Sequence, residues 1–573
     1  MKILLTAINA KYIHSNLAVY SLRAYGGKFK DSIEIREFTI NHRSEYILQE
    51  IYKIKPDVLC FSCYIWNYPY VWEIAAEIHK LLPDLPVWAG GPEVSFCISD
   101  TFLENPGFYG IMIGEGEASF LELAEHYCEG KGQENLYDIK GIAFRREGYG
   151  SEEIHITEER EPLDLSSIPF CYEDLEDFNH RIVYYESSRG CPFRCSYCLS
   201  SLEKSMRFRD LEMVKRELAF FIEREVPQVK FVDRTFNCNH LHAMEIWKWI
   251  GEMDRGITNF HFEIAADLLT KEELALLASF RPGLVQLEIG VQSTNEKTLR
   301  EIRRTASLRQ IEDVVMDIRD VGNIHQHLDL IAGLPYEGFD SFARSFREVY
   351  ALKPNQLQLG FLKVLKGSFI YEKQEEYGIL YKSLPPYEVM ETKWLSYGEL
   401  LSIKLVEEML EVYYNSGQFE VTMKCLDVVY KDSFGFFLKL GEFYEGKGYL
   451  AMNHSRIRRC EILLEFLQAE GKISMDLVME SLLFDLYYRE NIKSRPIWAI
   501  NPSVFAQITR KHCKNGKLTH IEPFFYHFPR TGERLEILPE RLKEEIYVEF
   551  DYKNRDALHH QAKVVEYRKE ELI

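Results

Sequence analysis

The chain has 573 residues, of which 46% are hydrophobic and 13% aromatic, so it is long enough for roughly three to four domains with well-packed cores. Its formal net charge of -20 disfavours a protein that coats nucleic acid, so nucleic acid is an unlikely partner. No run of about 18 apolar residues occurs, and we expect no membrane-spanning helix. The apolar run at the N-terminus is too short for a signal peptide, so the twelve cysteines indicate reduced thiols in the cytoplasm.

The first part of the chain, residues 1–135, alternates predicted strands with predicted helices. Apolar runs predict strands at 2–8, 33–40, 57–65 and 86–91, helices at about 15–25, 43–54 and 70–82, and a strand that turns into a helix at 109–127. This spacing predicts an α/β fold with a doubly wound, Rossmann-like parallel sheet. Such sheets bind ligands in the crevice beyond the carboxyl ends of their strands.

Residues 136–178 connect this sheet to a second α/β series. Alternating residues at 138–157, with a Gly-centred turn, predict a β-hairpin, and residues 161–175 read as an extended linker.

The second series spans residues 179–384. Its predicted strands lie at 181–188, 228–236, 259–267, 283–293, 326–335 and 355–365. Six strands, most of them followed by a helical pattern, predict a partial (β/α)6 barrel of the TIM type. Residues 385–573 predict a mostly helical C-terminal domain of unknown function. From its position we expect this domain to cap the open side of the barrel and to help define the substrate.

Three cysteines lie within eight positions in "CPFRCSYC", directly after the first barrel strand. A structural zinc site needs four protein ligands, and no second ligand pair follows Cys191, Cys195 and Cys198 at a readable spacing. Three thiolates from a short loop suit an iron–sulfur cluster in which one iron lacks a protein ligand. The loop also lies at the carboxyl end of the barrel, where barrel chemistry occurs. A zinc knuckle and a loop of reduced thiols stay open as alternatives.

The cysteine loop resembles the signature of the radical S-adenosylmethionine (SAM) superfamily, and the resemblance extends over about 180–365. "FVDRTFN" (231–237), "EIGVQSTN" (288–295) and "LDLIAGLPYE" (328–337) are similar to the family's second-, fourth- and fifth-strand segments. The resemblance implies a [4Fe-4S] cluster whose open iron chelates SAM. It also implies reductive cleavage of SAM to a 5'-deoxyadenosyl radical, with electrons from a donor such as flavodoxin or ferredoxin.

The same resemblance assigns SAM contacts to individual residues. It places the backbone of Tyr197 against the adenine, Asp233 near the methionine end, Glu288 and Gln292 near the ribose, and the turn that contains Ile331, Gly333 and Pro335 beside the adenine. A hydrogen-bonding role at the barrel rim is the alternative for such residues.

Glycine-rich segments end successive strands of the first sheet, in "AGGPEVS" (89–95) and "IGEGEAS" (113–119). Taken in order after Ser62, they resemble the cobalamin-binding domain that precedes many radical SAM barrels. The resemblance covers about 1–130 and places the following residues around the nucleotide tail of the corrinoid: Ser62, Gly90, Gly91, Gly114, Glu115, Gly116 and Glu117. Ordinary strand–helix turns are the alternative.

A cobalt-coordinating histidine is not expected. Many cobalamin proteins carry Asp-x-His-x-x-Gly after the first strand, whereas here Tyr12 precedes His14 in place of the aspartate and Leu17 replaces the glycine. Without the carboxylate that fixes the imidazole tautomer, His14 is a poor axial ligand. We expect a cobalt whose lower face is open or bound to water.

The sequence thus predicts a cobalamin-dependent radical SAM enzyme that methylates an unactivated carbon of a small or otherwise unknown substrate. One rival is a methylthiotransferase-like enzyme that modifies RNA or protein, with a second cluster on Cys60, Cys97 and Cys128. Another is a non-catalytic cobalamin or redox sensor. For the three additional cysteines, packing as small apolar side chains is the simpler account.

Overall fold

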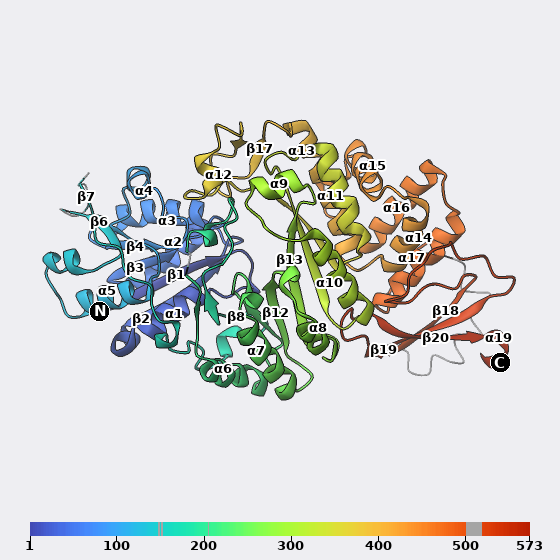
Figure 1. Cartoon of the computed structure of the whole chain (residues 1–573), viewed down its shortest axis with the longest axis horizontal. Coiled ribbons are helices and arrows are strands. Elements are labelled where there is room, and N and C mark those ends of the chain that lie inside the picture. Colours follow the sequence, from blue (N-terminus) through green and yellow to red (C-terminus); the bar gives the residue numbers. More distant parts are fainter. Residues whose placement is uncertain (147–148, 150–152, 204, 500–517, 573) are drawn as a thin grey trace.

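The computed structural model describes residues 1–146, 149, 153–203, 205–499 and 518–572. Three parts follow one another along the long axis of the molecule, in chain order (Figure 1). They are an N-terminal sheet covered by helices, a central barrel-like sheet and a C-terminal part rich in helices. The α/β fold class and this division agree with the sequence prediction.

The N-terminal sheet has the strand order β2-β1-β3-β4-β5-β6-β7. Its first five strands are parallel, as predicted, and β6 and β7 add antiparallel strands at one edge. The predicted hairpin therefore extends this sheet, while most of its Gly-centred turn lies outside the described residues. The strands are β1 (Ile3–Asn9), β2 (Ile33–Thr39), β3 (Val58–Ser62), β4 (Val87–Gly90), β5 (Gly110–Met112), β6 (Ile142–Arg145) and β7 (Ile154–Ile156).

Helices cover both faces of this sheet. Leu4 and Ile8 of β1 pack in an apolar cluster with α2 and α3, whereas the alternate residues Ile3 and Leu5 pack in a second cluster with α1 and α5. Burial of both faces explains why β1 is an unbroken apolar run. The helices are α1 (Leu17–Tyr25), α2 (Ser44–Ile54), α3 (Tyr68–Leu81), α4 (Ile98–Glu104) and α5 (Glu117–Cys128).

The central sheet contains the six predicted barrel strands, all parallel, in the order β15-β14-β13-β12-β11-β8. The described strands β15 and β8 are its two edges, so the barrel is partial. The strands are β8 (Val183–Tyr185), β11 (Gln228–Phe231), β12 (Asn259–Ile264), β13 (Val285–Gln292), β14 (His325–Ala332) and β15 (Gln356–Phe361). The helices are α6 (Leu211–Glu223), α7 (His240–Met253), α8 (Lys271–Ala278), α9 (Glu296–Glu301), α10 (Leu308–Val321) and α11 (Phe339–Ala351).

The C-terminal part is mostly helical, as predicted, and ends in a three-stranded antiparallel sheet. Short elements α12 (Phe369–Glu372), β16 (Leu380–Tyr381) and β17 (Val389–Glu391) lead into it. Its main elements are α13 (Tyr397–Leu410), α14 (Glu420–Val429), α15 (Ser433–Gly446), α16 (Arg456–Glu470), α17 (Met475–Arg489), β18 (Thr519–Phe524), β19 (Ile546–Arg555), β20 (Ala562–Arg568) and α19 (Lys569–Leu572). In the described part of the chain, every helix is too short or too polar to cross a membrane.

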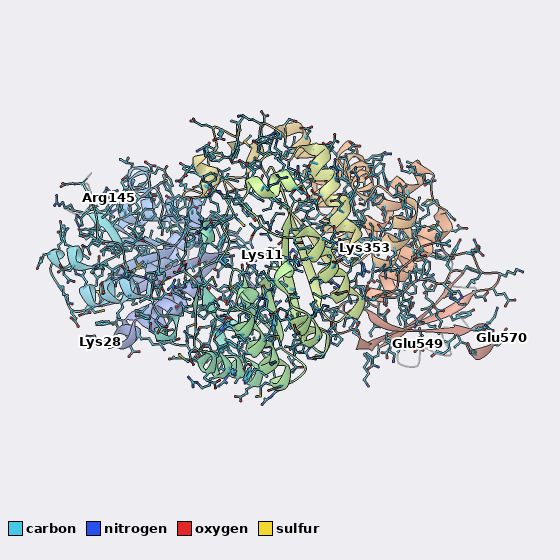
Figure 2. The ribbon with its side chains drawn as sticks, viewed as in Figure 1. Lys11, Lys28, Arg145, Lys353, Glu549 and Glu570 are labelled. Carbon is cyan, nitrogen blue, oxygen red and sulfur yellow. The ribbon has the colours of Figure 1, made fainter. Side chains whose placement is uncertain are left out.

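The C-terminal part covers the free edge of the barrel sheet. The Asn415 carboxamide accepts the backbone N–H of Leu357 in β15 (2.9 Å) and donates to the carbonyl of the same residue (2.8 Å). Lys353, just after α11, pairs with Asp427 of α14 (Nζ–Oδ2 2.7 Å) at the junction between the two parts (Figure 2). Because an exposed strand edge would pair with other chains, this contact protects the barrel.

We predict that Phe346→Ala weakens this junction. Phe346 is fully buried on α11, and its ring centroid lies 5.5 Å from that of Phe434 and 6.0 Å from that of Phe437, both on α15. Truncation leaves a cavity, and we expect a loss of about 3–5 kcal/mol in the free energy of unfolding, measured by denaturant titration. The matched control is Glu348→Ala on the exposed face of the same helix, which should change stability by about 0.5 kcal/mol or less.

Candidate functional site

A cavity of about 1280 Å³ lies where the carboxyl ends of the N-terminal strands meet the mouth of the barrel. Its volume exceeds the roughly 300–1,000 Å³ of a typical small-ligand pocket, so it has room for more than one ligand. All seven predicted residues of the N-terminal sheet line it, namely Ser62, Gly90, Gly91, Gly114, Glu115, Gly116 and Glu117. From the barrel, the predicted residues Tyr197, Cys198, Gln292 and Ile331 line the same cavity.

The glycines at the strand ends have conformations that a side chain would disturb. Gly91 has φ +115°, and a Cβ there would meet the carbonyl oxygen of Cys63 at 2.5 Å. Gly114 has φ +72° and faces open space, with no heavy atom within 4 Å of a built Cβ. Because neither position carries a side chain, the backbone itself forms this wall of the cavity, and a large cofactor can approach it closely.

The cysteine loop follows β9 (Ser188–Arg189) and begins at Gly190, whose φ is +101°. Cys195 is buried, and its sulfur accepts a hydrogen bond from Arg304 (Nη1–Sγ 3.8 Å). Burial raises the pKa of the Cys195 thiol, and the charge of Arg304 opposes this. Cys191 Sγ lies 3.6 Å from Thr235 Oγ1, and Cys198 borders the cavity. Three thiols on one loop, one of them at the cavity wall, fit an iron–sulfur cluster that faces the cavity.

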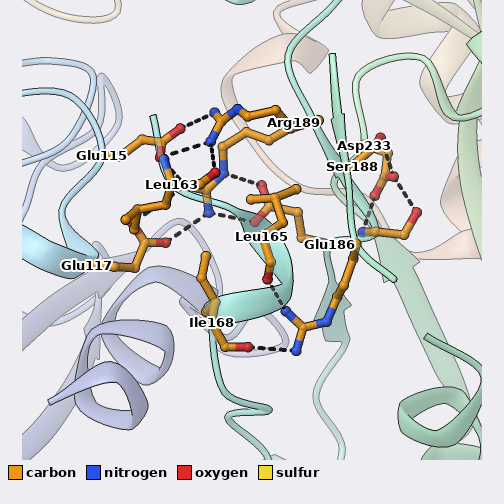
Figure 3. A network of polar contacts seen from close by, with 12 residues as sticks. Glu115, Glu117, Leu163, Leu165, Ile168, Glu186, Ser188, Arg189 and Asp233 are labelled. Atoms are coloured by element: carbon orange, nitrogen blue, oxygen red, sulfur yellow. Dashed lines mark hydrogen bonds and ion pairs between the residues drawn. The ribbon is translucent and has the colours of Figure 1, made fainter. Parts of the chain in front are cut away.

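Two arginines that the sequence analysis did not single out join the two parts. Arg189 and Arg207 are cross-strand partners in the two-residue ribbon of β9 and β10 (Arg207–Phe208). Arg189 contacts Glu117 (2.8 Å), Glu115 (3.3 Å) and Glu186 (2.7 Å), and Figure 3 shows its guanidinium between these carboxylates. Arg207 also binds Glu115, and it donates a hydrogen bond to the carbonyl of Leu163 (2.6 Å).

This arginine network changes the interpretation of the Gly-Glu-Gly-Glu segment. Burial alone would raise the pKa of Glu115, but hydrogen bonds and charges from Arg207 and Arg189 hold it below its ordinary value. The arginines of the barrel part therefore hold the Glu115 carboxylate ionised, and Glu117 pairs with Arg189. Both glutamates line the cavity, and their side chains tie this loop to Arg189, which precedes Cys191, and to Arg207.

Four other predicted SAM-site residues are not among those that line the cavity. Asp233 is buried and accepts hydrogen bonds from the Ser187 N–H (3.0 Å) and from the hydroxyls of Ser187 and Ser188 (2.6 Å each). It therefore fixes the chain just before the cysteine loop, and its proposed SAM contact stays a prediction. The carboxylate of Glu288 binds Lys230 inside the barrel and lies 3.0 Å from His261 Nε2. Gly333, at φ +88°, packs against Val389, and Pro335 is buried.

His14 lies in a second, smaller cavity of about 690 Å³ between the two α/β parts. Its Nδ1 is 2.7 Å from the hydroxyl of Tyr184, and the neighbouring Ser15 hydroxyl donates to the carbonyl of Ile182 (2.9 Å). Burial lowers the pKa of His14, as do the charges of nearby lysines. His14 thus lines a cavity and is hydrogen-bonded to the barrel part.

The three cysteines of the rival second cluster lie on different faces of the N-terminal sheet. Cys60 and Cys128 pack in the apolar cluster with α1 and α5, and burial raises the pKa of Cys60 to about 12. Cys97 directly precedes α4, whose Phe102 packs in the cluster on the opposite face. This arrangement favours packing over cluster binding for these thiols.

Family models match all three parts of the chain. The model for the radical SAM superfamily matches residues 185–349, that for the B12 binding domain matches 3–124, and that for a protein family of unknown function (DUF4080) matches 375–554. The chain therefore contains a region that matches the radical SAM superfamily and a region that matches the B12 binding domain. The radical SAM domain implies a [4Fe-4S] cluster and SAM, and the B12-binding domain implies cobalamin.

Curated relatives of this chain include proteins named as methyltransferases of different substrates. A 2-(S-pantetheinyl)-carbapenam-3-carboxylate methyltransferase of Streptantibioticus cattleyicolor is 26% identical over 51% of this chain and 44% of its own length. The cobalamin-dependent radical SAM methyltransferase TokK of Streptomyces tokunonensis is 24% identical over 57% of this chain and 50% of its own length. The hopanoid C-3 methylase of Methylococcus capsulatus is 25% identical over 55% of this chain and 60% of its own length. The matched region thus spans about half the length of these relatives.

Solved structures share the fold. The cobalamin-dependent radical SAM enzyme OxsB, with aqua-cobalamin and SAM bound, is 16% identical with a TM-score of 0.57, and the match covers 84% of this chain and 78% of OxsB. The methyltransferase TsrM from Kitasatospora setae, with cobalamin and a [4Fe-4S] cluster bound, is 18% identical with a TM-score of 0.52, over 68% of this chain and 82% of TsrM.

We predict that Arg189→Met weakens cobalamin binding by about tenfold or more, equivalent to about 1.4 kcal/mol. Glu117 then stays buried without its cation, and breaking such a pair is costly. An absorbance titration of the cofactor-free protein with hydroxocobalamin measures the effect. Adding Glu117→Gln to Arg189→Met should restore part of the cobalamin affinity. The control variant Arg300→Gln loses an exposed ion pair with Glu296 and should bind cobalamin as the wild type does. Equal affinities for all variants would contradict the role of the arginine network.

Asp233 should make stability depend on pH. Burial, opposed by the serine hydrogen bonds, raises its pKa to about 6, whereas an unfolded aspartate titrates near 3.9. Between these values the folded chain binds more protons, so this carboxyl contributes less stability as pH rises from about 4 to about 6. We therefore expect Asp233→Asn to gain stability relative to the wild type over that range, measured as the melting temperature. Parallel pH profiles for the two proteins would contradict this.

Proposed function

We propose that this protein is a cobalamin-dependent radical SAM methyltransferase that transfers a methyl group to an unactivated carbon of a small-molecule substrate. The observation that carries the proposal is the shared cavity, because the strand-end glycines and Cys198 line the same space. The printed names of the curated relatives support methyl transfer. An electron donor of the flavodoxin or ferredoxin type is part of the proposal.

Cys191, Cys195 and Cys198 would hold the cluster, and the wall formed by Gly90, Gly91 and Gly114 would hold the corrinoid. When bound, the cluster and SAM supply radical chemistry and cobalamin supplies a transferable methyl group. Arg304, half-buried beside Cys195, offsets the negative charge that a thiolate brings into the protein interior.

The protein's own contribution is to hold the two walls of the cavity in one geometry. The ion pairs of Arg189 and Arg207 fix the Gly-Glu-Gly-Glu segment relative to the cysteine loop. Reacting groups that are held in fixed positions avoid the entropic cost of finding one another. The cavity lies between two packed parts, which limits access of bulk water to reactive species.

The test is an anaerobic incubation with reductant, cell extract and SAM labelled in its methyl group. We expect 5'-deoxyadenosine together with label in a small-molecule product. Loss of both in Cys191→Ala, Cys195→Ala and Cys198→Ala would support the cluster assignment, and persistence of 5'-deoxyadenosine would refute it. The control is Cys460→Ala, a buried cysteine of the C-terminal part. Formation of 5'-deoxyadenosine without label transfer to any product would exclude methyl transfer and leave other radical chemistry.

A further inference from the structure

The inner face of the barrel sheet is polar. On strands β11 to β14, alternate residues pack outward in the apolar core, and the residues between them face the lumen. These lumen residues include Lys230, His261, Glu288, His327 and Asp329. A closed TIM barrel fills this space with bulky apolar side chains, so the charged lumen here requires a separate explanation.

Two of these contacts bring a histidine to a carboxylate without forming a hydrogen bond. His327 Nε2 lies 3.1 Å from Asp329 Oδ1, and His261 Nε2 lies 3.0 Å from Glu288 Oε2. Both nitrogens and Asp329 Oδ1 are sealed from solvent, and none has a hydrogen-bond partner. His327 and His261 are only 8% and 6% exposed. The nitrogen and oxygen atoms of each pair are close, but they do not point at each other.

The separation of His327 Nε2 from Asp329 Oδ1 is that of two neighbouring ligand atoms around a shared cation. When bonds to a metal are about 2.1 Å long, neighbouring ligand atoms of an octahedral site lie about 3.0 Å apart and aim at the metal instead of one another. One ligand atom each from Glu288, His327 and Asp329 lies within 4.8 Å of the others. We propose that Glu288, His327 and Asp329 bind a divalent first-row transition metal inside the barrel, at a site separate from the cysteine loop.

Lys230 orients the proposed ligand Glu288 from outside the site. Its Nζ is 2.9 Å from Oε2, the same oxygen that His261 approaches. Outer partners of this kind hold a ligating carboxylate in place. Two carboxylates also balance the charge of a divalent ion, and mixed imidazole and carboxylate ligands suit Mn²⁺, Fe²⁺ and Zn²⁺.

The proposed site opens toward the reaction space. Asp329 lines the large cavity together with Gln358 of the neighbouring strand β15. Three protein ligands leave coordination positions for a further oxygen or nitrogen donor, as in catalytic metal sites. A donor atom of a small molecule in the cavity can take such a position.

The test is a titration of the full-length protein, loaded with its cluster, with Mn²⁺, in which free Mn²⁺ is measured by its EPR signal. We expect one saturable site per chain, and an affinity that falls by about tenfold or more in His327→Ala and Asp329→Asn. The matched control is His325→Ala, which changes a histidine on the same strand and the same face but outside the ligand set, and it should bind as the wild type does. Circular dichroism confirms that each variant is folded.

The cysteine variants separate this proposal from the proposed function. Cys191→Ala, Cys195→Ala and Cys198→Ala should lose 5'-deoxyadenosine formation but keep the Mn²⁺ site. Asp329→Glu, which retains a carboxylate, should bind more tightly than Asp329→Asn. If the wild type and the double variant His327→Ala, Asp329→Asn bind Mn²⁺ equally, the proposal is wrong. The side chains of Glu288, His327 and Asp329 then form a proton-sharing network only.

Discussion

The arrangement of the two α/β parts depends on the carboxylates that neutralise the positive charges of Arg189 and Arg207. The ribbon of β9 and β10 places these two cations directly opposite each other, where like charges repel. Carboxylates from both parts of the chain offset that repulsion, and Glu115 contacts both guanidiniums. Because Arg189 lies two residues before Cys191 and Glu115 lies in the loop after β5, this interaction sets the distance between the cysteine loop and the strand-end glycines.

The cavity combines two kinds of surface that serve different purposes. On the N-terminal side, glycines such as Gly91 and Gly114 expose backbone, which suits a large cofactor that binds by shape. On the barrel side, the wall continues through Asp329 and Gln358 into a charged lumen. A cobalamin-binding wall and a polar barrel mouth thus share one space, and the C-terminal part completes the barrel by covering its free strand edge through Asn415.

Most of the fold could be predicted from the sequence because apolar periodicity is local. The six barrel strands and the five parallel N-terminal strands all lie where their apolar runs predicted them. The seven strand-end residues and Cys198, which the sequence assigned to cofactor sites, line one cavity, and their cofactor contacts stay predictions. The arginine network was not predicted, since isolated arginines carry no signal until their partners, dozens of residues away, are known. Asp233 and Glu288 lie near the predicted site, but their carboxylates have other partners.

The sequence by itself determined the chemistry that is available: three thiols on one loop, glycines at strand ends and a family assignment that implies three cofactors. These features depend on residue type and short spacing, which the chain order fixes. Only the tertiary structure decided which side chains face the cavity and which serve as supports. Glu115 and Glu117 show the reason, because their carboxylates form ion pairs with arginines that lie about 70 to 90 residues further along the chain. The pairing of distant charges depends on packing, and no local pattern encodes it.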